Sequence, residues 1–240
     1  MTRTPGASQA SRRDGARAVH TLVVATTNRG KLAELRALLE GLPVRLLAMD
    51  EVLRPPPVVV EDGASFAENA TKKARAIAAA TMSLTLADDS GLEVDILGGK
   101  PGVHSARFAR ERATDAENNA ALVAALEAAG DPMGVSEGGA YTARFRCALA
   151  LVDPYDSVDD AAIEEGVCVG SVCTSARGSF GFGYDPLFLV AGKDKTMAEL
   201  SEVEKNALSH RSRACLAMRP VIERVLAERE RTIRGIEKAP

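Results

Sequence analysis

The chain has 240 residues and a mass of 25.2 kDa, which is enough for one large domain with a substantial buried core. Apolar residues make up 46% and charged residues 26%, a globular composition that excludes low-complexity and collagen-like chains. No apolar stretch approaches the roughly 18 residues that cross a bilayer, so we expect no membrane partner. A net charge of −3 and 4% aromatic residues without tryptophan argue against a nucleic-acid partner.

Residues 1–19 differ in composition from the rest of the chain. They contain four arginines against one aspartate, a local charge of +3, and no apolar run. This composition favours a disordered leader over the alternative, an arginine-rich transit peptide. We therefore expect a single domain over residues 20–240. Its four cysteines include no C-x-x-C pair, which indicates reduced thiols in a cytoplasmic protein.

Hydrophobic periodicity gives the first elements in chain order. Residues 22–25 predict a short buried strand, and leucines at helical spacing predict a helix over 32–42 that Pro43 ends. Residues 44–48 predict a second strand, and the prolines at 55–57 predict a stiff connector.

Capping motifs locate two further helices. A capping box at 65–68 opens a helix that runs to about residue 80, and another at 114–117 opens a helix that Gly130 closes. Residues 131–139 are rich in small and polar residues and are expected to form a loop.

The second half of the chain predicts two longer strands and a final helix. The strands cover 141–152 and 165–175 and are candidates for a hairpin across an aspartate-rich loop. The helix begins near Ser209, and Pro220 is expected to kink or break it. Together with an apolar strand at 84–87, this order predicts an α/β fold with a mixed sheet.

A polar turn leads from the first strand into the first helix, with the sequence Thr26-Thr27-Asn28-Arg29-Gly30-Lys31. Backbone amides at a helix N-terminus bind phosphate, and the lysine adds a positive charge. The turn is not a Walker A loop, because Leu32 occupies the position of the required Ser or Thr. A plain helix cap by Thr27 or Asn28 is an equally good interpretation of these residues alone.

Two acidic residues follow the strand at 84–87 in the sequence Asp88-Asp89-Ser90-Gly91. Open α/β sheets bind ligands at the carboxyl ends of their strands, and carboxylates suit Mg²⁺. Because successive side chains of an extended backbone diverge, only one of the two is expected to face the pocket. The alternative is an acidic turn. Glu61 is a candidate for a second metal carboxylate or for an exposed loop acid.

Two later segments combine residue types that bind nucleotides. Residues 179–186, Ser-Phe-Gly-Phe-Gly-Tyr-Asp-Pro, place aromatic faces that stack on bases beside glycines that allow close approach. The alternative for this segment is a strand with a glycine bulge. Residues 205–211 place a lysine, a histidine and an arginine at the predicted start of a helix. These side chains are candidates for binding phosphate or the base, and the alternative is a solvated, charged helix face.

Six motifs follow one another along the chain. They are Thr26-Thr27-Asn28-x-x-Lys31, Glu61-x-Gly63-x-Ser65-Phe66-x-Glu68-Asn69-Ala70, Ala87-Asp88-Asp89-Ser90-Gly91-Leu92-x-Val94, Leu97-x-Gly99-x-Pro101-Gly102-Val103-x-Ser105-Ala106-Arg107-Phe108, Gly181-Phe182-Gly183-Tyr184-Asp185-Pro186-x-Phe188 and Lys205-Asn206-x-x-Ser209-His210-Arg211. In this order they resemble the inosine/xanthosine triphosphate pyrophosphatase family, over roughly residues 21–219. Six motifs in order are far more specific than any one of them.

The resemblance implies an α/β fold in which a long mixed central sheet and its helices form two lobes around a substrate cleft. It also implies a homodimer and the Mg²⁺-dependent hydrolysis of XTP, ITP and dITP to the monophosphate and pyrophosphate. A non-catalytic nucleotide sensor and a pyrophosphatase for modified pyrimidine triphosphates are the alternatives. The sequence departs from the family where Thr27 replaces a usual glycine and Asp62 a common threonine, which leaves loop geometry and selectivity open.

The resemblance further assigns roles to individual residues. Asp89 is implied as the proton acceptor and, with Glu61, as a metal ligand. The implied substrate-binding residues are Thr26, Thr27, Asn28, Arg29, Gly30 and Lys31 for the triphosphate, Ser90, then Phe182, Gly183, Tyr184 and Asp185 for the base pocket, and Lys205, His210 and Arg211 for phosphate and the 6-oxo edge of the base.

Overall fold

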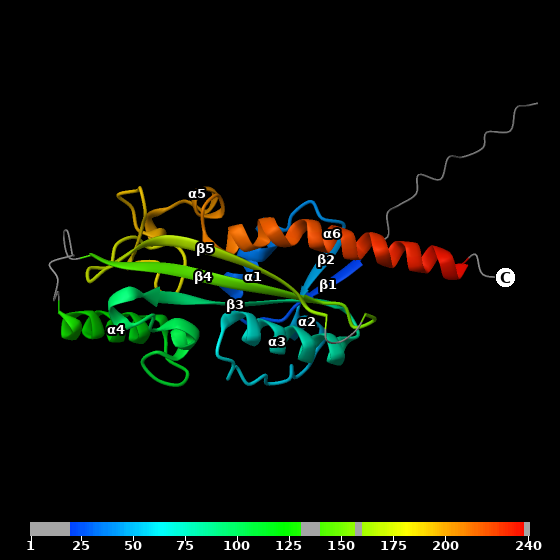
Figure 1. The fold of residues 1–240 in the computed structure, drawn as a ribbon, viewed down its shortest axis with the longest axis horizontal. Coiled ribbons are helices and arrows are strands. Elements are labelled where there is room, and N and C mark those ends of the chain that lie inside the picture. The colour runs from blue at the N-terminus through cyan, green and yellow to red at the C-terminus, as the bar shows by residue number, and fades with distance from the viewer. Residues whose placement is uncertain (1–19, 131–139, 157–159, 238–240) are drawn as a thin grey trace, which may run out of the picture.

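Six strands form one mixed sheet in a computed structural model that describes residues 20–130, 140–156 and 160–237 (Figure 1). The strand order is β2-β1-β3-β4-β5-β6, in which β1 runs parallel to β2 and β3 while each later neighbour is antiparallel. The strands are β1 (His20–Val24), β2 (Val44–Ala48), β3 (Leu84–Val94), β4 (Ala140–Val152), β5 (Ala162–Cys173) and β6 (Phe188–Val190). The predicted α/β class and the predicted hairpin of two long strands are confirmed.

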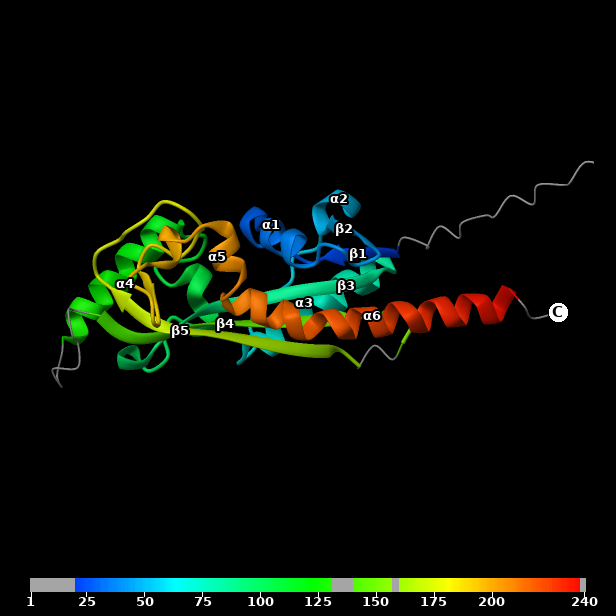
Figure 2. The same cartoon turned by 90° about the horizontal axis from the view of Figure 1, so that it is seen from above.

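Helices cover both faces of this sheet (Figures 1 and 2). They are α1 (Arg29–Leu38), α2 (Met49–Val52), α3 (Phe66–Thr81), α4 (Asp115–Ala129), α5 (Glu202–Asn206) and α6 (His210–Glu237). The helix α3 packs on one face, α1 and α6 pack on the other, and α4 lies at the far end of the long strands. The expected leader 1–19 and loop 131–139 lie outside the described residues.

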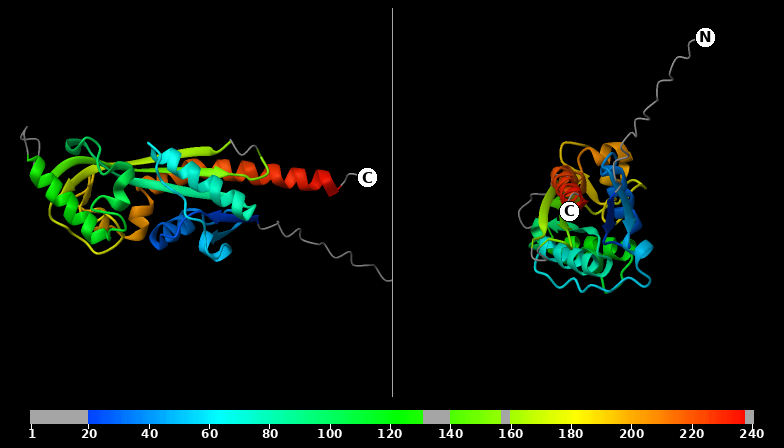
Figure 3. Two further views of the ribbon diagram at one scale, coloured as in Figure 1. Left: turned by 90° about the horizontal axis from the view of Figure 1, so that it is seen from below. Right: turned by 90° about the vertical axis from the view of Figure 1, so that its right-hand side faces the viewer.

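Three hydrophobic clusters fill the interior and divide it along the length of the sheet. At one end, the leucines of α1 and apolar residues of α6 pack on one face of β1, β3 and β4, while the alanines of α3 pack on the opposite face. At the other end, the far halves of β3 to β5 pack with α4 and β6. The long strands pass through both regions, so their middle residues lie between them (Figure 3).

The helix caps follow the local sequence. Asn28 caps α1 by accepting a hydrogen bond from the backbone of Lys31 at 3.0 Å. Ser65 and Thr114 cap α3 and α4, and Gly130 closes α4 with a positive φ of 65°, as the sequence predicts. Asn28, rather than Thr27, is therefore the residue that starts the helix after the first strand.

Two predicted elements differ from the structure, and the alternative interpretation of a third segment is ruled out. The strand expected to end at Ala87 continues to Val94, because β4 pairs with it throughout and places Ala148 opposite Asp89. The helix α6 runs through Pro220 without a break. Residues 179–186 form turns rather than an alternating strand, since Gly181 and Gly183 have positive φ angles of 79° and 63°.

All four cysteines are free thiols, as predicted, and three of them are buried. Within the described ranges, no helix has both the length and the apolar character that crossing a bilayer requires.

Gly166 of β5 lets the first turn of α6 lie directly on the sheet, because a Cβ there would overlap the backbone of His210 and Ala214. We expect Gly166→Ala to destabilise the fold by about 1–3 kcal/mol, the usual cost of overpacking. The free energy of unfolding in urea measures this effect. Gly235→Ala is the matched control, since a Cβ added to Gly235, near the exposed end of α6, would have no atom within 4 Å. Equal stabilities for the two variants would contradict the close packing of α6 on β5.

Candidate active site

The middle of β3 carries the two acidic residues singled out in the sequence. Successive side chains of a strand point to opposite faces of its sheet. Asp88 therefore pairs with cations from α1 and α6, and Asp89 with a cation from α3. Both residues are buried, at 1% and 6% exposure. Both residues line one cavity, but the side chain of Asp88 is 0% exposed, whereas that of Asp89 is 9% exposed. The two side chains diverge, as the extended backbone predicts.

On the α1 and α6 side, Asp88 lies between two cations. Lys31 Nζ is 2.6 Å from its Oδ1, and Arg211 Nε is 2.8 Å from its Oδ2. Burial alone would raise the pKa of Asp88, but Arg211 and Lys31 outweigh burial and hold that pKa well below its usual range. Ser90 joins the group by donating to Asp88 and accepting from Arg211. Asp88 therefore stays ionised and orients the two cations.

A buried glutamate extends this ion-pair network towards the far end of the sheet. Glu34 of α1 pairs with Arg211 and lies 2.7 Å from Lys205 Nζ, which is itself 2.6 Å from Asp185 Oδ2. The resulting chain of alternating charges is Asp88, Arg211, Glu34, Lys205 and Asp185. Because each charge is buried and paired, each one fixes the position of its neighbours.

On the α3 side, Lys73 binds both acids that the resemblance implies as metal ligands. Its Nζ is 3.0 Å from Asp89 Oδ1, 3.0 Å from Glu61 Oε2 and 2.8 Å from the carbonyl oxygen of Asp88. Burial raises the pKa of Asp89 despite the attraction of Lys73. Burial also acts to raise the pKa of Glu61, but Lys73 outweighs it and lowers that pKa. Arg107 holds the loop that carries Glu61 by donating a hydrogen bond to the backbone carbonyl oxygen of Glu61 at 2.9 Å.

The two carboxylates fit a magnesium ion. Asp89 Oδ2 is buried and has no hydrogen-bond partner among the described residues, so a cation beside it would satisfy an orphaned oxygen. No cluster of three or more histidine, cysteine or acidic ligands occurs in the described part of the chain. Mg²⁺ needs no such cluster, because it keeps several waters and takes substrate phosphates beside one or two carboxylates.

The loop between β5 and β6 provides aromatic groups near the same cations. The ring of Phe182 has Lys205 Nζ 4.9 Å and Arg211 Cζ 5.6 Å from its centroid, within cation–π range. The hydroxyl of Tyr184 donates to the carbonyl of Ser105 at 2.8 Å, and burial raises its pKa.

His210 lies beside this aromatic group at the start of α6. Its ring stacks on Phe145, with centroids 4.8 Å apart and planes 17° apart. Burial lowers the pKa of His210 well below its usual value, and the positive charge of Arg211 lowers it further. The imidazole is therefore neutral at physiological pH.

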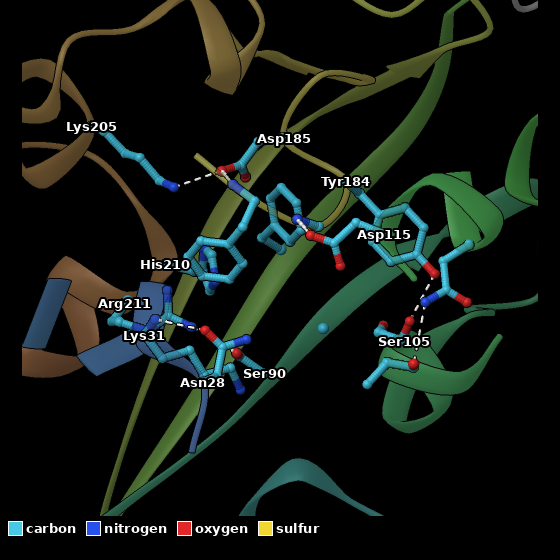
Figure 4. Close-up of a pocket in the computed structure, with 16 residues that line it drawn as sticks. Asn28, Lys31, Ser90, Ser105, Asp115, Tyr184, Asp185, Lys205, His210 and Arg211 are labelled. Atoms are coloured by element: carbon cyan, nitrogen blue, oxygen red, sulfur yellow. Dashed lines mark hydrogen bonds and ion pairs between the residues drawn. The ribbon is translucent and has the colours of Figure 1, made fainter. Parts of the chain in front are cut away.

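Two adjoining cavities bring the predicted residues together. The first, the aromatic cavity, is drawn in Figure 4 and is lined by Phe182, Gly183, Tyr184, Asp185, Lys205, His210 and Arg211. The second, the ionic cavity, is lined by Thr26, Thr27, Glu61, Lys73, Asp88 and Asp89. The residues common to both are Asn28, Lys31, Ser90 and Ala106. A ligand that occupies both cavities would pass Lys31 and Ser90 at their junction.

Two residues of the predicted phosphate turn line neither cavity. The side chain of Arg29 is exposed and pairs with Asp50 at 2.6 Å, away from the site. Gly30 lies beneath the ring of Phe182, where a Cβ would overlap it. The structure therefore places Arg29 outside the site and gives Gly30 a packing role.

The sequence motifs did not single out several residues that hold the site. Lys73, Glu34 and Asp115 fall in this group, and each lies in a helix of the structure. The only sequence signal for Lys73 is a position on α3 beside buried small residues, where a lysine needs a buried partner. Nothing in the local sequence distinguishes Glu34, whose partners lie on distant elements.

Comparisons with known proteins find relatives that match most of this chain. A dITP/XTP pyrophosphatase of Geobacter sulfurreducens is 49% identical over 193 residues, which cover 80% of this chain and 92% of that protein. A dITP/XTP pyrophosphatase of Syntrophobacter fumaroxidans is 46% identical, covering 85% and 83%. The structure of a HAM1 protein from Coxiella burnetii matches with a TM-score of 0.75 at 38% identity, covering 86% of this chain and 100% of that one.

A further solved structure is a nucleoside-triphosphatase, or dITP/XTP pyrophosphatase, from Mycobacterium abscessus. It matches with a TM-score of 0.64 at 42% identity, covering 83% of this chain and 99% of that one. The profile of the Ham1 family matches residues 22–221, which include all six motifs. The chain belongs to the Ham1 family.

Proposed function

We propose that this chain hydrolyses dITP, XTP and ITP to the nucleoside monophosphate and pyrophosphate, and so removes deaminated purines from the nucleotide pool. The observation that carries this proposal is the junction of the ionic cavity with the aromatic cavity at Asn28, Lys31 and Ser90. A nucleoside triphosphate has the same two parts, an anionic chain and a flat base. The relatives in Geobacter and Syntrophobacter carry the name of this activity.

The triphosphate fits the ionic cavity. Thr26, Thr27 and Asn28 line it at the N-terminus of α1, where unpaired amides and the helix dipole favour anions. Lys31 adds a charge at the junction, already oriented by Asp88. Arg29 takes no part, because its side chain points to Asp50.

Glu61 and Asp89 would hold Mg²⁺, supported by the orphaned Asp89 oxygen. When bound, Mg²⁺ supplies charge neutralisation at the phosphate oxygens. Asp89 accepts the proton of the attacking water, because its Oδ2 has no hydrogen-bond partner among the described residues. Lys73 holds the carboxylates of Asp89 and Glu61 in position, and Lys31 offsets the charge that develops on the leaving pyrophosphate.

The base fits the aromatic cavity, where Phe182 and Tyr184 supply rings. Lys205 and Arg211 line this cavity and are donors without acceptor capacity. A 6-oxo group accepts a hydrogen bond from the remaining N–H donors of these cations, whereas the 6-amino group of adenine offers them only further donors. This preference supports inosine and xanthosine nucleotides over ATP.

We also propose that the enzyme acts in the cytoplasm as a homodimer. Four free thiols, three of them buried, suit a reducing compartment. The dimer rests on the family resemblance.

Product analysis tests the proposed function. We expect ITP, XTP and dITP incubated with Mg²⁺ to give monophosphate and pyrophosphate, with little product from ATP and none after chelation. Release of inorganic phosphate and diphosphate would contradict the placement of the triphosphate. Tight nucleotide binding without turnover would indicate a sensor, and turnover of modified pyrimidine triphosphates alone would overturn the purine assignment.

A further inference from the structure

The loop that lines the aromatic cavity is held at its centre by α4. Asp115 Oδ2 accepts a hydrogen bond from the backbone N–H of Gly183 at 2.7 Å. Asn119 Nδ2 donates to the carbonyl oxygen of the same residue at 3.0 Å. Asp115 and Asn119 are four positions apart and so lie on one face of α4. The two side chains therefore hydrogen-bond to both the backbone N–H and the carbonyl oxygen of Gly183. We call this pair of side chains the Gly183 clamp.

Both hydrogen bonds that Gly183 makes go to this clamp, and a turn also encloses the residue, because the backbone N–H of Asp185 donates to the carbonyl oxygen of Phe182 at 3.3 Å. Within the described residues it makes no other hydrogen bond, and its positive φ of 63° is a conformation that glycine adopts without strain. It has no side chain with which to pack. Its neighbours are fixed independently, since Tyr184 bonds to Ser105 and Asp185 pairs with Lys205.

The clamp also borders the space where the base would lie. Asp115 and Gly183 both line the aromatic cavity, and Figure 4 shows Asp115 beside the ring of Tyr184. Asp115 Oδ2 accepts the hydrogen bond from Gly183, whereas Asp115 Oδ1 makes no hydrogen bond within the described ranges.

The side-chain oxygen of Asn119 indicates that this residue is not present for packing alone. Its Oδ1 is buried and has no hydrogen-bond partner among the described residues. A buried unpaired oxygen costs stability, so this amide is not an optimal packing group at its position. Leucine, which is similar in size, would remove that cost while also removing the donor to Gly183.

We propose that Asp115 and Asn119 are positioning residues that set the base-pocket loop through Gly183 and thereby determine affinity for the purine. This inference rests on the proposed function, because it assigns the base to the aromatic cavity. Neither residue touches the ionic cavity, so the clamp acts on binding of the base and leaves the chemistry at the phosphate unchanged.

The test compares Asn119→Leu and Asp115→Ala with the wild-type chain. We expect the KM for ITP to rise by about three- to ten-fold, the effect of losing one net hydrogen bond, with kcat nearly unchanged. Calorimetry should show the same loss of affinity for inosine monophosphate and an unchanged affinity for inorganic pyrophosphate. Asp115→Asn keeps an acceptor and should restore most of the affinity. Glu127→Gln, an exposed change at the far end of α4, is the control.

The outcomes separate this inference from the proposed function. Wild-type chain that hydrolyses ITP, with variants that bind inosine monophosphate normally, would overturn the clamp alone. Equal weakening for inosine monophosphate and pyrophosphate would also overturn it, because a general structural defect weakens both. Wild-type chain that leaves ITP intact would refute the proposed function, and binding of inosine monophosphate would still test the clamp.

Discussion

Replacement of Asp89 by asparagine is expected to reduce ITP turnover by about 10²–10⁴-fold, the contribution that general acid–base catalysis makes. Asparagine keeps the shape of the side chain but neither accepts a proton at neutral pH nor carries charge for a cation. Asp89 is 6% exposed, and its Oδ2 has no partner in the described part of the chain, so this oxygen is available for chemistry. Pyrophosphate release with Mg²⁺ measures the effect.

A neighbouring acid provides the matched control for this substitution. Asp62 is next to Glu61 in the same loop, but its side chain is 68% exposed and pairs with Lys72 at 2.5 Å. Asp62→Asn should leave turnover close to that of the wild type. Calorimetric binding of ITP to Asp89→Asn checks that the site still forms. Retained binding with wild-type turnover would show that another group accepts the proton.

The elements that the sequence predicted correctly have simple hydrophobic patterns and strong caps. The leucines of α1, the alanines of α3 and the cap at Thr114 each specify their element locally. The length of β3 is different, because aspartates disfavour strands and only pairing with β4 carries the strand past Asp88. Tertiary contacts thus set the length of β3, the strand that carries Asp88 and Asp89.

The same distinction applies to the site: some of its residues could be predicted from local sequence motifs, and others could not. The motifs contain most of the charged residues that line the cavities, including Asp88, Lys205 and Arg211. Two of their partners, Lys73 and Glu34, are missing from the motifs, because each of these pairs joins separate elements of the chain. Lys73 and Asp89 are 16 residues apart, and Glu34 and Arg211 are 177 residues apart. Periodicity and capping describe neighbours along the chain, so they carry no signal for such pairs.

Arg211→Met is expected to lower the free energy of unfolding by about 3–5 kcal/mol, the usual cost of removing one partner from a buried ion pair. The side chain of Arg211 is 1% exposed and pairs with both Asp88 and Glu34. Without the guanidinium, these two carboxylates remain buried with only Lys31 and Lys205 to compensate them. Urea unfolding of the full chain measures the loss.

An exposed arginine on the same helix shows why burial decides the size of this effect. Arg234 pairs with Glu230 at 2.8 Å, but its side chain is 66% exposed. Water screens such a pair and ordering two long side chains costs entropy, so Arg234→Met should cost about 0–1 kcal/mol. The two substitutions remove the same group from one helix and differ in the medium around it. Similar losses for both would mean that the buried network contributes no more to stability than a surface pair.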